Sequence, residues 1–209
     1  MHVRVIRYAV ISLAALISVS ISAVASAQPA PAAGQAPAAA ARPAPQPPLL
    51  MTSTAWEDGG VIPDKFTQAA GPAAVSPELK WSQVPAGTQS FVLLLHDPEP
   101  VLNKGSKMDI THWLIWNIPG TSTGLAENVI AGELADGSRQ VSLRGNAYMG
   151  PGAPPGPYHH YTFELYALDT KLEVPQGTAM QAGATRTAVI DAMDGHVLGK
   201  AVLVARFHR

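Results

Sequence analysis

The strongest constraint on the fold comes from four strand-length apolar runs separated by turn residues. They cover Ser90 to His96, His112 to Ile118, Tyr161 to Leu168 and Ala201 to Phe207. Each is rich in β-branched or aromatic side chains and is bounded by Pro- or Gly-containing breaks, which is typical of β-strands. The sequence therefore predicts a mainly β fold, and an antiparallel β-sandwich is the most economical architecture.

The third of these runs also indicates which side of the strand is buried. Alternate residues of a strand point to opposite faces. One face carries Tyr161, Phe163, Leu165 and Ala167, and the other carries Thr162, Glu164 and Tyr166. We expect the first face to pack into the core and the second to be partly solvated. The aromatic residues Trp81, Trp113 and Trp116 are also expected in the core.

One or two short helices near the C-terminus complete the predicted fold. The main candidate runs from Thr185 to Met193, where Val189, Ile190 and Met193 would form its apolar side. Gly195 follows directly and is expected to end the helix.

The first 27 residues have the pattern of an export signal. Arg4 and Arg7 precede an uncharged stretch from Tyr8 to Ala27, which closes on Ala25-Ser26-Ala27. A basic start, an apolar centre and small residues before a cleavage point are typical of secretory signal peptides, so we expect cleavage after Ala27. The alternative is an uncleaved anchor, because the apolar stretch is long enough to span a bilayer. Both readings predict export, to the periplasm or to the medium.

Residues 28–48 form a Pro/Ala-rich segment, with 7 Pro and 9 Ala among 21 positions. Proline lacks a backbone donor and fixes φ, so this segment is expected to be a disordered linker. Residues 49–209 remain as the folded domain. They carry 11 basic and 15 acidic side chains, a formal charge of −4.

The amino-acid composition limits the kinds of functional site that the chain can form. The chain has no cysteine, which excludes disulfides, thiol nucleophiles and iron–sulfur clusters. Its 14 basic residues against 15 acidic ones argue against the broad basic surface that nucleic-acid binding needs. Histidines, carboxylates, hydroxyls and backbone groups are left to form any site.

Such residues gather at two loop-to-strand junctions. The first begins at His96-Asp97-Pro98-Glu99-Pro100 and ends at His112. The second is a Gly/Pro-rich loop from Tyr148 to Tyr161. Because glycine has no Cβ, such a loop can bring backbone N–H groups close to a ligand, and the resulting cradle suits an anion.

These motifs resemble the phosphatidylethanolamine-binding protein family, in particular its bacterial Raf-kinase-inhibitor-like (YbhB/YbcL-type) branch. The resemblance extends from about Thr52 to the C-terminus. The matching segments are Ser76-Pro77-Glu78-Leu79-Lys80-Trp81, Pro85-Ala86-Gly87-Thr88, Asp97-Pro98, His112-Trp113-Leu114-Ile115-Trp116-Asn117-Ile118, Gly150-Pro151 with His159-His160-Tyr161, and Gly195-His196-Val197-Leu198.

The resemblance implies a β-sandwich with a small anion pocket at one end. Carried over by motif, the side chains of Asp97, His112, His159 and Tyr161 would line the pocket, with the backbone of Gly150 and Gly152 closing it. Imidazole, phenol and backbone donors would bind phosphate oxygens. The implied ligand is a small anion, phosphate or phosphoethanolamine-like, such as a phospholipid head group. Neither a cofactor nor catalysis is expected.

Two alternatives to this binding function remain open. The family includes protein inhibitors, so a protease or kinase-type partner is a second functional hypothesis, and transient contact with a membrane surface is compatible with either. A metal-dependent hydrolase is the third hypothesis, because Asp97, His112 and His159 form a 2-His-1-carboxylate set.

The segment from Glu99 to Asp109 departs from the family pattern, so the resemblance does not predict the structure of that rim of the pocket. His160 is expected to face solvent, on the opposite side of the strand from the pocket.

Overall fold

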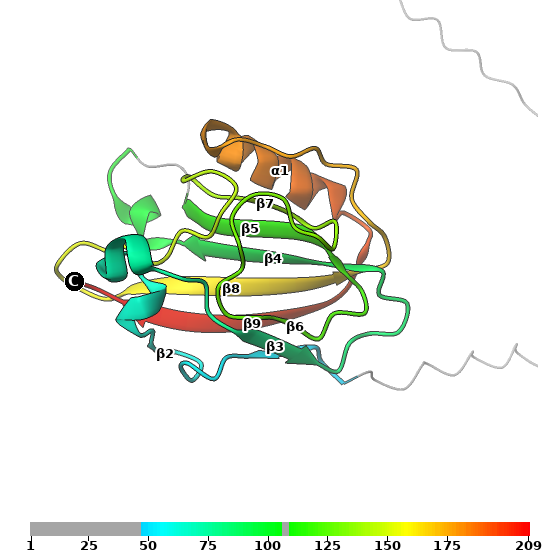
Figure 1. Cartoon of the computed structure of the whole chain (residues 1–209), viewed down its shortest axis with the longest axis horizontal. Helices are drawn as coiled ribbons and strands as arrows, with labels where there is room; N and C mark the ends of the chain where they lie inside the picture. Colours follow the sequence, from blue (N-terminus) through cyan, green and yellow to red (C-terminus); the bar gives the residue numbers. More distant parts are fainter. Residues whose placement is uncertain (1–46, 106–108) are drawn as a thin grey trace, which may run out of the picture. The chain divides into compact units, whose positions relative to one another are not determined.

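The computed structural model describes residues 47–105 and 109–209, which form a mainly β domain of two sheets (Figure 1). The larger sheet has the strand order β2-β9-β8-β4-β5-β7, and its neighbours are antiparallel except for β2 and β9. Its strands are β2 (Gly60–Val61), β4 (Ser90–Asp97), β5 (Ile110–Pro119), β7 (Arg139–Val141), β8 (His159–Leu168) and β9 (Val197–Phe207). The four predicted runs lie within β4, β5, β8 and β9.

The smaller sheet has three antiparallel strands in the order β1-β3-β6. They are β1 (Leu50–Thr52), β3 (Leu79–Ser82) and β6 (Gly124–Leu125). The main core fills the space between the two sheets. It joins Met51 and Trp81 of the smaller sheet to Leu93, Trp113 and Phe163 of the larger one. The predicted β-sandwich is therefore confirmed.

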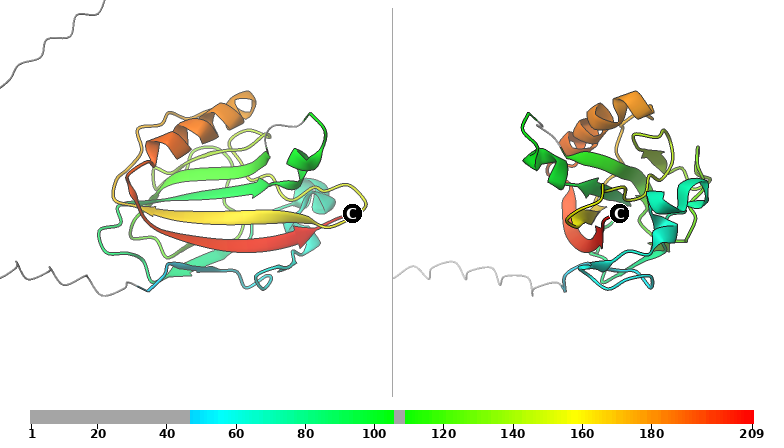
Figure 2. Two further views of the ribbon diagram at one scale, coloured as in Figure 1. Left: turned by 180° about the vertical axis from the view of Figure 1, so that it is seen from behind. Right: turned by 90° about the vertical axis from the view of Figure 1, so that its left-hand side faces the viewer.

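A second apolar cluster covers part of the opposite face of the larger sheet. Helix α1 (Ala182–Ala192) packs there, so the helix and the smaller sheet lie on opposite sides of the larger sheet (Figure 2). This cluster includes Val92, Leu114 and Trp116 from the sheet. The helix covers β4 and β5 rather than β9, where Val202 stays 44% exposed.

Strand β8 follows the predicted alternation. The inward residues Tyr161, Phe163, Leu165 and Ala167 are fully buried, and Thr162, Glu164 and Tyr166 are half-buried. Trp81, Trp113 and Trp116 are also buried, as expected.

Helix α1 begins three residues earlier than predicted, and one of its residues was assigned to the wrong face. Val189 and Met193 are buried, but Ile190 is 43% exposed. Residues 182, 185, 189 and 193 share one helical stripe because their spacing follows the helical repeat, whereas position 190 lies about 100° away. The start shifts because Thr178 and Gln181 form a capping box in the preceding 3₁₀ helix, Ala179–Gln181.

Three further 3₁₀ helices occur, and they cover Asp64–Phe66, Gln68–Ala73 and Glu99–Leu102. The last lies in the segment from Glu99 to Asp109 that departs from the family pattern. The predicted signal peptide and all of the predicted linker except Pro47 and Pro48 lie outside the described residues. Within residues 47–105 and 109–209, no helix is both long and apolar enough to cross a membrane.

Candidate functional site

Three strand junctions meet at one end of the larger sheet. β4 ends at Asp97, β5 begins at Ile110 and β8 begins at His159. The register pairs Asp97 with Ile110, and His96 with Thr162. Because antiparallel neighbours run in opposite directions, the end of β4 lies beside the starts of β5 and β8. Residues far apart in the sequence therefore converge at this edge.

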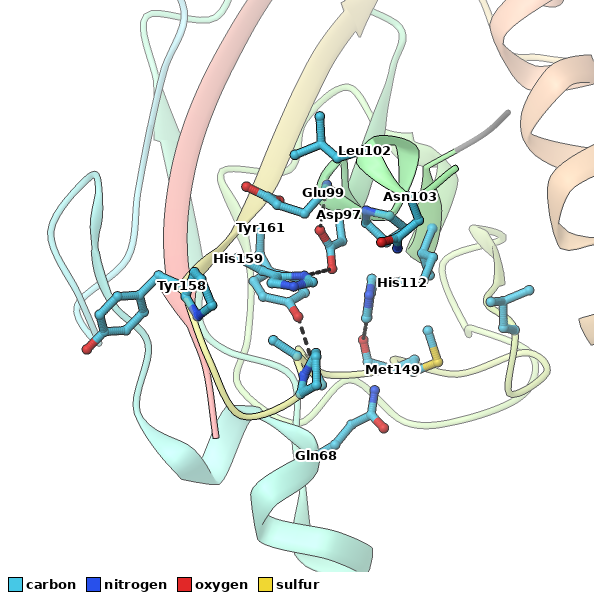
Figure 3. Close-up of a pocket in the computed structure, with 17 residues that line it drawn as sticks. Gln68, Asp97, Glu99, Leu102, Asn103, His112, Met149, Tyr158, His159 and Tyr161 are labelled. Atoms are coloured by element: carbon cyan, nitrogen blue, oxygen red, sulfur yellow. Dashed lines mark hydrogen bonds and ion pairs between the residues drawn. The ribbon is translucent and has the colours of Figure 1, made fainter. Parts of the chain in front are cut away.

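A cavity of about 570 Å³ lies at this convergence (Figure 3). Five of the six residues predicted for the site line it: Asp97, His112, Gly152, His159 and Tyr161. Gly150 lies outside the lining. Figure 3 shows the side chains of Asp97 and His159 turned toward one another, with the His112 ring between Asp97 and Met149 in this view. Their roles in ligand binding remain a prediction.

Asp97 is the most buried carboxylate of the cavity, with 3% of its surface exposed. His159 Nδ1 lies 2.8 Å from its Oδ2, and the Glu99 backbone N–H donates to its Oδ1 over 3.0 Å. Burial raises the pKa of Asp97 above its ordinary value, although the hydrogen bond with His159 opposes the shift. Asp97 and His159 therefore form a buried, hydrogen-bonded pair across the end of β4 and the start of β8.

His112 is equally buried and has a defined tautomer. Its Nδ1 lies 3.2 Å from the carbonyl oxygen of Met149 and 3.1 Å from that of Gly150. Carbonyl oxygens only accept, so the proton must be on Nδ1 and Nε2 carries a lone pair. Burial lowers the pKa of His112 to about 4, which keeps the ring neutral near pH 7.

The Nε2 atom of His112 has no hydrogen-bond partner among the described residues, and it is buried. Leaving a buried polar atom unsatisfied costs about 1–3 kcal/mol, so such an atom calls for an explanation. With this tautomer Nε2 accepts, so the expected donation from His112 to a phosphate oxygen would need a protonated ring. At neutral pH its free nitrogen accepts.

The ring of Tyr161 contacts the rings of His112 and His159. It makes an edge-on contact with His112 at 5.1 Å and stacks on His159 at 6.4 Å, both measured between ring centroids. Its hydroxyl accepts a hydrogen bond of 3.1 Å from the Gly152 backbone N–H. Burial raises the pKa of Tyr161, so the hydroxyl keeps its proton and can donate it.

The Gly/Pro loop differs from the expected cradle of free N–H groups. The Gly152 N–H donates to Tyr161, and the Gly150 carbonyl accepts from His112 and from Gln68 Nε2. Packing requires glycine at position 150 and favours it at position 152. A Cβ on Gly150 would lie 2.5 Å from the Phe66 carbonyl oxygen, and one on Gly152 would lie 2.2 Å from Gln68 Nε2. The loop thus fits closely against residues 66–68.

Sequence reasoning missed several residues that line the cavity. The polar ones are Gln68, Glu99 and Asn103, and among the apolar ones are Leu102, Leu143 and Tyr158. Leu102 is 82% exposed. Glu99 lies two residues after Asp97 in the same short motif, and this proximity could have been a signal. Gln68 comes from a distant segment that carries no recognisable pattern.

Glu99 is held by the neighbouring His160. The His160 backbone N–H donates to Glu99 Oε2 over 3.0 Å, and His160 Nδ1 lies 2.6 Å from Oε1. Burial alone would raise the pKa of Glu99, but the hydrogen bonds that its carboxylate accepts from His160 oppose this shift, and the pKa lies below its ordinary value. His160 faces solvent, as expected, and lies outside the cavity lining.

The predicted metal set is not assembled. Among the described residues, the group whose ligand atoms all lie within 4.8 Å of one another is Asp97, Glu99 and His159, without His112. In this group both carboxylates already accept hydrogen bonds from His159, His160 or the Glu99 backbone. The geometry therefore favours a hydrogen-bonded binding cavity.

Comparison with known proteins agrees with this fold. The family model for phosphatidylethanolamine-binding proteins matches residues 52–208. A UPF0098 protein of Methanothermobacter thermautotrophicus is 42% identical over 158 residues, which is 74% of this chain and 95% of that protein. A UPF0098 protein of Chlamydia muridarum is 30% identical over 160 residues, or 76% and 98% of the two chains.

Two solved structures are similar over nearly their whole length. The crystal structure of a PEBP homologue from Chlamydia trachomatis has a TM-score of 0.63 and 28% identity, and the match covers 78% of this chain and 98% of that one. The structure of E. coli YbcL, described as a member of the mammalian PEBP family, has a TM-score of 0.62 and 27% identity, with coverages of 77% and 98%.

Proposed function

Because the chain belongs to the phosphatidylethanolamine-binding protein family, we propose that it is an exported, non-enzymatic binding protein whose end cavity takes small phosphate-bearing ligands, such as phospholipid head groups. One observation carries this proposal. Polar side chains from three strands converge on one cavity, where the buried Nε2 of His112 lacks a partner among the described residues. A bound ligand would supply that partner.

The cavity offers both apolar and polar contacts to such a ligand. Leu102, Leu143 and Tyr158 would contact an organic substituent, and the hydroxyl of Tyr161 and the amide of Asn103 can donate to phosphate oxygens. A mostly apolar lining with a few polar groups is typical of small-molecule sites. No Lys or Arg lines the cavity among the described residues. We therefore expect weak affinity.

Titration with inorganic phosphate and with phosphoethanolamine, followed by NMR, tests the proposal. Both ligands should shift signals of His112, His159 and Tyr161. His159→Ala should weaken binding, because it removes a cavity side chain and the partner of Asp97. His196→Ala is a matched control, since His196 pairs with Asp169 at the same 2.8 Å but lies outside the cavity lining. Silence of all signals at millimolar ligand would contradict the proposal.

Export is a separate part of the proposal and has its own test. The basic, apolar and small-residue regions of residues 1–27 motivate it. Fractionation of the producing cell, followed by N-terminal sequencing of the mature chain, should find the protein outside the cytoplasm with Gln28 as its first residue. Recovery of the full-length chain from the cytoplasm would contradict export.

A further inference from the structure

The cavity presents an unusual set of polar groups for an anion site. It contains two carboxylates, Asp97 and Glu99, and the lone pair of His112 Nε2. Lys104 is exposed and lies outside the lining. An anion here meets acceptors as well as donors, so its own hydrogen-bonding capacity decides whether it fits.

Resting on the proposed function, we propose that the cavity selects ligands that carry a hydrogen-bond donor on the phosphate itself. It would bind inorganic phosphate and phosphomonoesters, including a free head group such as phosphoethanolamine, through a P–O–H group that donates to His112 Nε2. It would reject sulfate and phosphodiesters, including the head group of an intact phospholipid, which bring no such hydrogen, so the inference narrows the proposed function to free head groups. The juxtaposition that carries this proposal is the buried, unpartnered Nε2 of His112 and the buried carboxylate of Asp97, which line one cavity.

The direction of the hydrogen bond follows from the loop. Nδ1 of His112 lies within 3.2 Å of two carbonyl oxygens, those of Met149 and Gly150. Rotating the ring by 180° would place a carbon there and leave both contacts unmade, so the ring orientation is fixed. With the proton on Nδ1, Nε2 can only accept.

Near neutral pH the His112 ring is not protonated, so Nε2 does not become a donor. Burial opposes the charged form most strongly, and the charges of His96 and Arg144 oppose it further. Asp97 and Tyr161 also face the ring from the cavity side, and Asp97 already accepts from His159 and from the Glu99 backbone. No donor among the described residues is hydrogen-bonded to Nε2, so a bound ligand can supply the hydrogen.

Phosphomonoesters meet this need at mildly acidic pH. Their second pKa is about 6, so at pH 5 they are monoanions with one P–O–H group. A phosphodiester is also a monoanion at pH 5, but it has no hydrogen on phosphate. Methyl phosphate and dimethyl phosphate are therefore matched in charge and differ in the donor. Both are small compared with a cavity of about 570 Å³.

The experiment is calorimetric titration of the wild-type protein with methyl phosphate and dimethyl phosphate at pH 5, with inorganic phosphate and sulfate as a second pair. Methyl phosphate should bind tighter than dimethyl phosphate by about tenfold or more, as expected for leaving a buried acceptor unsatisfied. Phosphate should likewise bind more tightly than sulfate. NMR of ¹⁵N-histidine protein should show the Nε2 signal of His112 moving only with the donor-bearing ligands.

Two variants distinguish the effect of the ligand's P–O–H donor from the effect of the negative charge in the cavity. His112→Leu should reduce the preference for methyl over dimethyl phosphate, provided that circular dichroism shows it folded. Asp97→Asn removes a negative charge but leaves Nε2 in place, so both affinities should rise while the preference persists. Equal affinity of the wild type for the two esters would overturn this inference and leave the proposed function standing. Absence of binding by every phosphate compound would refute the proposed function itself.

Discussion

Acidification should destabilise the protein through His112 before the carboxylates with depressed pKa, such as Asp109, are protonated. Burial holds the pKa of His112 at about 4 in the folded protein, against an ordinary value of 6.5. Between these values the unfolded chain binds one more proton than the folded one, so stability falls as the pH drops. One pKa unit corresponds to about 1.4 kcal/mol, so His112 alone should remove about 2 kcal/mol between pH 7 and pH 5.

Urea unfolding at pH 7, 6 and 5 measures this loss, and substitution isolates its source. His112→Asn removes the titrating ring but keeps an amide that can donate to the loop carbonyls, so its stability should vary much less with pH. His196→Asn is the control, because it removes an exposed histidine and should leave the wild-type pH dependence in place. Carboxyl groups with depressed pKa, such as Asp109, act mainly below pH 4 and stay outside this window.

The reasoning would be refuted by parallel pH profiles of the wild type and His112→Asn. Direct NMR titration of the His112 ring gives an independent answer, since a midpoint near 6.5 would mean that burial does not hold the ring neutral. That result would also remove the support that neutrality lends to the proposed ligand selectivity.

Three further outcomes follow from the packing and the charge. Gly150→Ala places a Cβ 2.5 Å from the Phe66 carbonyl oxygen and should cost about 1–3 kcal/mol in thermal unfolding, whereas Gly152→Ala meets the movable Gln68 side chain and should cost less. Trp116→Ala empties a fully buried site under α1 and should cost about 3–5 kcal/mol in urea unfolding. Raising NaCl from about 20 to 200 mM should leave phosphate binding unchanged or tighter by calorimetry, because salt screens repulsion from the acidic cavity.

The parts of the fold that sequence could predict depend on local pattern. Alternation in β8 identified its buried face because each side chain's direction is set by its position in the strand. The assignment of Ile190 failed because apolar character alone does not determine the helical stripe, which here continues to the small residues Ala182 and Thr185. The capping box at Thr178 was a signal that could have moved the predicted start of the helix.

The parts of the site that sequence could not predict depend on partners from distant segments. Motif resemblance brought Asp97, His112 and His159 together as candidates, and the cavity contains all three. The resemblance gave no information on which nitrogen of His112 carries the proton. The carbonyl oxygens of Met149 and Gly150, 37 and 38 residues further along the chain, determine this. Gln68 was missed for the same reason, since its contact with Gly150 spans 82 residues.

The two junctions consequently act in different ways. The β4–β5 junction supplies charge and an acceptor directly, because Asp97 and His112 line the cavity. The Gly/Pro loop also lines the cavity, for example with Gly152 and Tyr158, and it acts indirectly as well, because its carbonyl at Gly150 sets the tautomer of His112 and its N–H at Gly152 positions the hydroxyl of Tyr161. A loop shift would therefore alter the hydrogen-bonding character of the cavity together with its lining. The close packing of Gly150 against the Phe66 carbonyl oxygen opposes that shift.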